Sequence, residues 1–163
     1  MAKDLIRVRK RFDGQAISGK VAFAASLGLF VNYDPTDINT PSLAKASGKK
    51  AFSLMRQVID DQGQGLPLQD FVFSRSTIIE PELIGNHVSA SKLIEAEIEG
   101  PTLLPSGVTG SVTTGTPAGT ELSTYQGGLR VRQSGDELFG HVRGQLTPVD
   151  SGNATRILVQ FVL

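Results

Sequence analysis

Residues 128–146 read GLRVRQSGDELFGHVRGQL, and this stretch decides the fold class because its apolar and polar side chains alternate. Leu129 and Val131 alternate with arginines, the turn residues Ser134-Gly135-Asp136 follow, and a second alternating run starts at Leu138. Successive side chains of a β-strand point to opposite faces, so a period of two predicts strands with one buried side. The stretch therefore predicts two antiparallel strands.

The last residues of the chain predict a third strand. Apolar side chains recur at every second position, at Ile157, Val159, Phe161 and Leu163. We expect this strand to be tied into a sheet, either sealing the core or forming an edge that a partner completes.

The first part of the chain predicts a hairpin. Lys3–Phe12 is rich in Ile, Val and Arg, Asp13-Gly14 follows, and Gln15–Phe23 is the expected return strand. Asp-Gly suits the two positive φ angles of a type I′ turn. Further strands are expected at Phe71–Ile79 and Leu93–Ile98.

One short α-helix is expected at about 49–60. The apolar residues there recur at a spacing of three and four, and Thr40-Pro41 upstream supplies a capping residue followed by proline. The whole pattern predicts a mainly β protein, an antiparallel β-sandwich or small β-barrel with this one helix. We expect a single compact unit over residues 1–163, with a subdivision into 1–100 and 107–163 at the Pro- and Gly-containing segment between them.

Composition fits a folded protein without a strong electrostatic preference. The chain holds 16 Lys and Arg against 16 Asp and Glu, so no global field attracts nucleic acid or an anionic membrane. The start of the chain lacks the long apolar run of a secretory signal, which predicts synthesis in a cytoplasm. Locally, however, residues 1–20 are basic and residues 80–99 are acidic. Two interpretations stay open: complementary surfaces for association, or solvated strand faces.

Reaction chemistry is not indicated by any motif. The chain has no cysteine, and its two histidines, His87 and His141, do not form a metal-binding spacing. Glu95 and Glu97 share one strand face, where a solvated face is favoured over a catalytic pair. We expect no catalytic residue, no cofactor and no metal ion.

The basic cluster Arg7, Arg9, Lys10 and Arg11 predicts a contact surface. A strand would line up its arginines to bind an acidic protein patch or phosphate, whereas basic residues on an edge strand also block unwanted pairing. Nucleic acid is the less favoured ligand, because only Phe12 is close enough to stack on a base.

The C-terminal segments Pro117–Leu122, Gly127–Val131, Gly135–Val142 and Ile157–Phe161 together resemble a pattern found in capsid decoration (cement) proteins of tailed bacteriophages. The resemblance is confined mainly to residues 117–163. It consists of a glycine turn leading into a strand, then Gly-Asp, then a strand with an apolar-Gly-x-Val pattern and a terminal apolar strand. It implies a β-barrel or sandwich that sits on the outer capsid surface, often as a dimer or trimer, and clamps neighbouring subunits.

From the resemblance we expect a non-enzymatic virion protein whose partners are the major capsid protein and its own copies, without membrane or nucleic acid. The expected protein-interface residues are basic or terminal: Arg7, Arg9, Lys10, Arg11, Arg130, Arg132, His141, Arg143, Phe161 and Leu163. A tail or head-fibre component is an alternative. A small β-barrel that binds a ligand or nucleic acid is an alternative of another class.

Overall fold

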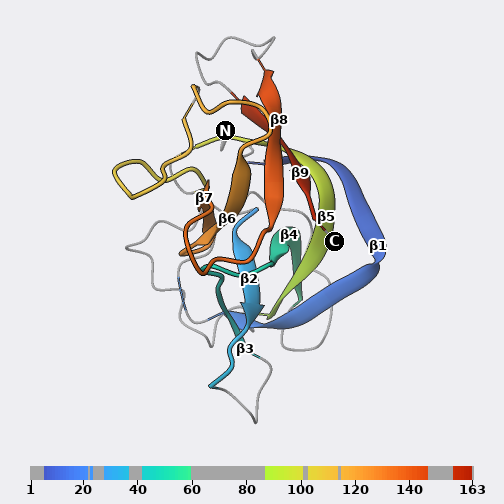
Figure 1. The fold of residues 1–163 in the computed structure, drawn as a ribbon. Helices are drawn as coiled ribbons and strands as arrows, with labels where there is room; N and C mark the ends of the chain where they lie inside the picture. The colour runs from blue at the N-terminus through green and yellow to red at the C-terminus, as the bar shows by residue number, and fades with distance from the viewer. Residues whose placement is uncertain are drawn as a thin grey trace.

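The computed structural model describes residues 6–21, 23, 28–36, 42–59, 87–100, 103–113, 115–146 and 156–162, in which nine strands form one sheet (Figure 1). The mainly β prediction is therefore confirmed. The strands are β1 (Ile6–Val21), β2 (Phe30–Tyr33), β3 (Ser42–Lys45), β4 (Phe52–Ile59), β5 (His87–Ile98), β6 (Glu121–Tyr125), β7 (Gly128–Val131), β8 (Gly140–Leu146) and β9 (Arg156–Phe161).

The first five strands close into a small barrel. Their order is β1-β3-β2-β4-β5, and β1 pairs with β5 as well, which completes the ring. The short β1–β3 pairing is parallel, whereas the other strand pairs of the ring are antiparallel. Pairing between both ends of a sheet removes open edges, which stabilises a small β-protein.

The remaining strands extend the sheet from the side of β5 that faces away from β1, in the order β9-β8-β6-β7. The two halves of β5 have different neighbours on that side, because Val88 pairs with β4 whereas Glu95 pairs with β9. Strand β9 thus lies between β5 and β8. Of the two alternatives for the terminal strand, the structure supports the seal of the core.

The predicted hairpin at Asp13-Gly14 is wrong. Strand β1 continues through this dipeptide, and both of its halves pair with β5, with a register shift between Phe12 and Ala16. Residues 13–15 are extra residues opposite β5 and form a bulge, which bends a strand without reversing it. Figure 1 shows the resulting corner in β1, at the right margin of the view. The strand expected at Leu93–Ile98 is confirmed as part of β5.

The predicted helix at about 49–60 is also wrong, because Phe52–Ile59 is strand β4. Leu54 and Val58 both pair with β5 residues, and the ladder is irregular between them. That irregularity breaks the strict period of two, so the apolar spacing of the sequence imitates a helix. The strand expected at Phe71–Ile79 lies outside the described residues.

One hydrophobic core runs through the barrel and the C-terminal strands. Phe30 of β2, Phe139 before β8 and Phe161 of β9 pack with ring centroids 4.9–5.7 Å apart. All three rings are buried, and so is Leu103, in the segment expected to subdivide the chain. Leu103 also accepts a backbone hydrogen bond of 2.7 Å from Leu129 of β7.

Candidate interaction surface

A row of polar side chains crosses five neighbouring strands on one side of the sheet. Register partners in antiparallel strands share a face, and successive partners lead across the strands in one line. The line consists of Lys10 on β1, Glu95 on β5, Gln160 on β9, His141 on β8 and Glu121 on β6. We call these five residues the polar row. Lys10, Gln160 and Glu121 are exposed, and the other two are half-buried.

Three of the expected interface arginines are bonded to members of the polar row. Arg9 contacts Glu95 at 3.4 Å, Arg143 donates to the Gln160 side chain at 2.7 Å, and Arg132 pairs with Glu121 at 2.7 Å. Arg9 and Arg143 each lie at a register shift of their strand, where an extra residue opposes the partner. The structure therefore brings the N-terminal basic cluster and the C-terminal basic residues onto one surface. From the sequence, these two groups were expected to form separate contacts.

The acidic segment of β5 is paired within the molecule. Glu97 and Glu99 are 8% and 4% exposed, respectively. Arg156 of β9 binds Glu97 at 3.6 Å and Glu99 at 3.0 Å, and Arg9 reaches Glu97 from β1 at 3.0 Å. Burial alone would lower the pKa of Arg156, but the hydrogen bonds and charges of Glu99 and Glu97 raise it on balance.

This network corrects two interpretations of the sequence. Glu97 does not lie on a solvated face, because it is buried between guanidinium groups of two flanking strands. The opposite charges of residues 1–20 and 80–99 meet in the same chain, in the Arg9–Glu95 and Arg9–Glu97 pairs, instead of being left over for a second copy. The ion pairs fix β1 and β9 against the two sides of β5.

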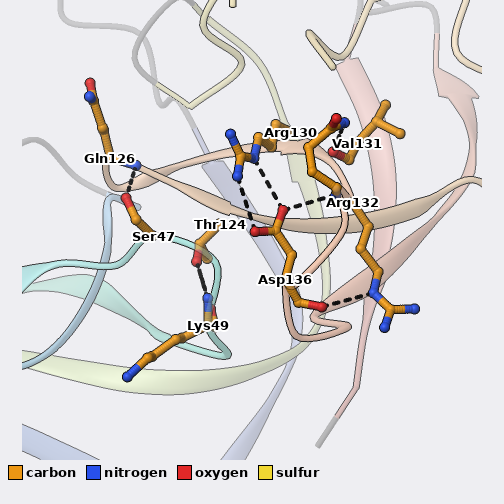
Figure 2. Close-up of polar contacts among 9 residues, drawn as sticks. Ser47, Lys49, Thr124, Gln126, Arg130, Val131, Arg132 and Asp136 are labelled. Atoms are coloured by element: carbon orange, nitrogen blue, oxygen red, sulfur yellow. Dashed lines mark hydrogen bonds and ion pairs between the residues drawn. The ribbon is translucent and has the colours of Figure 1, made fainter. Parts of the chain in front are cut away.

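Arg130 and Arg132 build the turn that precedes β8 (Figure 2). Arg130 holds the Asp136 carboxylate with two hydrogen bonds of 3.0 and 3.2 Å, and its guanidinium lies 4.7 Å from the Tyr125 ring centre. Arg132 donates to the Asp136 carbonyl at 3.0 Å, and the Gln133 amide donates to the carboxylate at 2.9 Å. Burial raises the pKa of Asp136, but these hydrogen bonds and the two arginine charges outweigh burial and lower it. Arg130 therefore has a structural role, since its charge is satisfied internally.

Sequence reasoning missed a joint between the barrel and the C-terminal strands, formed by the loop at residues 46–50. Thr124 is fully buried, and its hydroxyl donates to the Lys49 carbonyl at 2.6 Å and accepts from the Lys49 amide at 3.1 Å. The Gln126 amide donates to the Ser47 hydroxyl at 2.7 Å (Figure 2). Gly48 has a φ of 66°, and a Cβ there would lie 2.9 Å from an Asp136 oxygen. The available signal was the Ser47-Gly48 dipeptide, which is typical of turns.

The other expected interface residues are placed as follows. Phe161 is 5% exposed and belongs to the core, so it is not presented to a partner. Arg11 is exposed on β1, whereas the side chain of Arg7 and the whole of Leu163 lie outside the described residues. Within the described part of the chain, no three His, Cys, Asp or Glu side chains are grouped to hold a metal ion. Nor does that part contain a helix long and apolar enough to cross a membrane.

No protein-family model, curated protein or solved structure significantly matches this chain.

Proposed function

We propose that this chain is a non-enzymatic structural protein of a phage virion, which binds the outer surface of the capsid shell and stabilises contacts between major capsid protein subunits. It acts as a homo-oligomer, a dimer or trimer. The resemblance of residues 117–163 to decoration proteins suggests this role, and the polar row is the observation that supports it most directly.

The polar row suits binding to a large rigid surface. It lies on paired strands, and Arg9, Arg143 and Arg132 are already held by neighbouring side chains. Ordering a long side chain at an interface costs about 0.5–1.5 kcal/mol, so side chains that are fixed beforehand lose less on binding. A surface of this kind recognises a partner through charge pattern and shape, without any reaction.

Co-sedimentation with empty shells, assembled from the major capsid protein of the same phage, tests the proposal. The wild-type protein is expected to sediment with the shells and to raise their thermal transition. Arg143→Glu is expected to weaken binding, because it reverses a charge whose partner, Gln160, is neutral and exposed. Lys20→Glu, on the exposed second half of β1, is the matched control. Wild-type protein that stays in the supernatant at every concentration would refute the role.

Deleting residues 1–12 is not a clean test. Ile6 and Val8 of β1 pack against the core, so the deletion removes core contacts along with the basic cluster. Point substitutions of exposed side chains keep the fold and change only the surface.

A nucleic-acid-binding β-barrel is the second candidate, favoured by one observation. Phe12 is 42% exposed beside the exposed Arg9, Lys10 and Arg11, so an aromatic ring and cations lie together. Affinity for single-stranded DNA would then fall steeply with salt. Failure to bind heparin or DNA at low salt excludes this candidate.

A further inference from the structure

The N-terminal end of the polar row continues into an exposed segment of β1, residues 9–12. Arg9, Lys10, Arg11 and Phe12 are all exposed, although four successive residues of a regular half-buried strand would alternate. The register with β5 shifts twice within this segment, between Val8 and Lys10 and between Lys10 and Arg11. Because of these shifts, cations that a regular strand would place on opposite faces of the sheet are all exposed to solvent. Figure 1 shows β1 along the right margin of the molecule, with β5 on its inner side.

The segment remains cationic despite its ion pairs. Arg9, Lys10 and Arg11 carry three positive charges, whereas the two carboxylates that Arg9 contacts, Glu95 and Glu97, carry two, and Glu97 is shared with Arg156. Lys10 makes no hydrogen bond or ion pair with the described residues, and it stands at the end of the polar row. Beside it lies Phe12, an apolar ring that is 42% exposed, opposite Lys92 of β5.

We infer that residues 9–12 of β1 dock an acidic protein segment that carries an apolar side chain. Its carboxylates pair with Lys10 and the neighbouring arginines, and its apolar side chain covers the Phe12 ring. Desolvated aromatic anchors surrounded by polar contacts are typical of interface hot spots. This inference rests on the proposed function for the identity of the partner, an acidic segment of the shell protein.

A second copy of this chain fits the segment poorly. Two such segments brought together would place cations against cations, which opposes association. The register shifts also interrupt the regular ladder that strand addition needs. Nucleic acid is less favoured than protein, because the chain has a net charge of +0 and offers no long-range attraction to a polyanion.

The first test uses a capped peptide of about six residues that alternates Glu with Leu, a typical strand length. Isothermal titration at low salt measures its affinity for the full chain. Lys10→Glu and Phe12→Ser are each expected to weaken binding roughly tenfold, the loss expected for an interface anchor. Lys20→Glu and Tyr33→Ser are the matched controls, since they change an exposed lysine of the same strand and an exposed aromatic elsewhere. Both controls are expected to bind as the wild type does.

Several outcomes overturn the inference. The wild type shows no binding to the peptide, or the control variants lose as much affinity as the test variants, or heparin binds more tightly than the peptide and is unaffected by Phe12→Ser. Thermal midpoints of all four variants check that each one folds.

The same variants are then tested against shells, which separates this inference from the proposed function. Shells that bind wild type and Lys10→Glu equally leave the capsid role standing and refute the docking segment. If the peptide binds through Lys10 and Phe12 but the shells bind neither the wild type nor Lys10→Glu, the docking segment is supported and the capsid role is refuted.

Discussion

The barrel formed by β1–β5 and the C-terminal strands β6–β9 are held together by different kinds of contact. Strands β6 and β7 are joined by the two-residue turn Gln126-Gly127, in which both residues have positive φ, and the turn before β8 is fixed by Asp136. The barrel closes instead through distant partners, since Arg9 and Glu95 are 86 residues apart in the chain. The turns of the C-terminal strands therefore depend on nearby residues, whereas closure of the barrel depends on long-range contacts.

The comparison also shows that the C-terminal strands stabilise the barrel. Phe161 packs against Phe30 of the barrel, and Arg156 neutralises the buried carboxylates of β5. Strand β9 thus supplies the barrel with an apolar anchor and with a counter-charge. Substitutions that remove these contributions should affect the whole molecule, whereas substitutions on the outer side of β1 should not.

The largest effect is expected for Phe161→Ala. It removes a buried ring that contacts Phe30 and Phe139, and such truncations cost about 3–5 kcal/mol of unfolding free energy. Urea denaturation measures the loss. Phe12→Ala is the control, expected to change stability by less than about 0.5 kcal/mol because the ring is exposed. Similar losses in both variants would show that β9 is no more important to the core than β1.

Arg156→Met comes next. It keeps the apolar stem but leaves Glu97 and Glu99 buried with less counter-charge, which is expected to cost about 3 kcal/mol. Arg132→Met breaks the exposed pair with Glu121 and the hydrogen bond to the Asp136 carbonyl, which together should cost about 1–2 kcal/mol. Chemical denaturation of the two variants in parallel provides the comparison. A stable Arg156→Met protein would mean that the ion pairs do not tie β9 to the barrel.

A smaller loss is expected for Gly140→Ala, at the point where β8 meets β9. A Cβ at residue 140 would lie 2.8 Å from the Gln160 carbonyl oxygen, which is backbone and cannot move aside easily. Overpacking of this kind costs about 1–3 kcal/mol. Gly144→Ala, on the same strand, meets nothing within 4 Å and should change the thermal midpoint little. The prediction fails if the two alanine variants have the same thermal midpoint.

The smallest effect is the acid dependence of the turn at Asp136. The pKa of Asp136 is lowered in the folded protein, so its contribution to stability is present above its unfolded value of 3.8 and is lost as the pH falls through the folded pKa. The stability difference between wild type and Asp136→Asn should therefore shrink below about pH 4. Asp34 also has a lowered pKa, through its hydrogen bonds to Thr36 alone. No arginine charge adds to them as at Asp136, so Asp34→Asn should show a weaker pH dependence. Thermal unfolding at several acidic pH values measures both.

The C-terminal strands could be predicted from the sequence because their pattern is local. The buried residues Ile157, Val159 and Phe161 follow the predicted alternation. Phe139 departs from it: the alternation that starts at Leu138 places Phe139 on the same face as His141, but Phe139 precedes β8 and is buried. In the barrel, the bulge at residues 13–15 and the irregularity in β4 depend on the register with β5, which no local pattern contains.

The candidate surface shows the same limit. The basic residues could be found from composition, but their alignment with Glu95, Gln160 and Glu121 depends on the strand order β1-β5-β9-β8-β6. The type I′ hairpin was expected at Asp13-Gly14, whereas the structure has two positive φ angles at Gln126-Gly127. Asp-Gly is the stronger local signal, but tertiary pairing with β5 overrides it.

The long separation in sequence between β1 and its partner strand β5 has a consequence during translation. Arg9 leaves the ribosome 86 residues before Glu95. At ordinary elongation rates this is a delay of roughly ten seconds, during which the first half of β1 lacks its partner strand β5. Its bulge and its row of cations hinder pairing with the same strand of a neighbouring nascent chain. The irregular, basic strand thus protects the polypeptide from aggregation before the barrel can close.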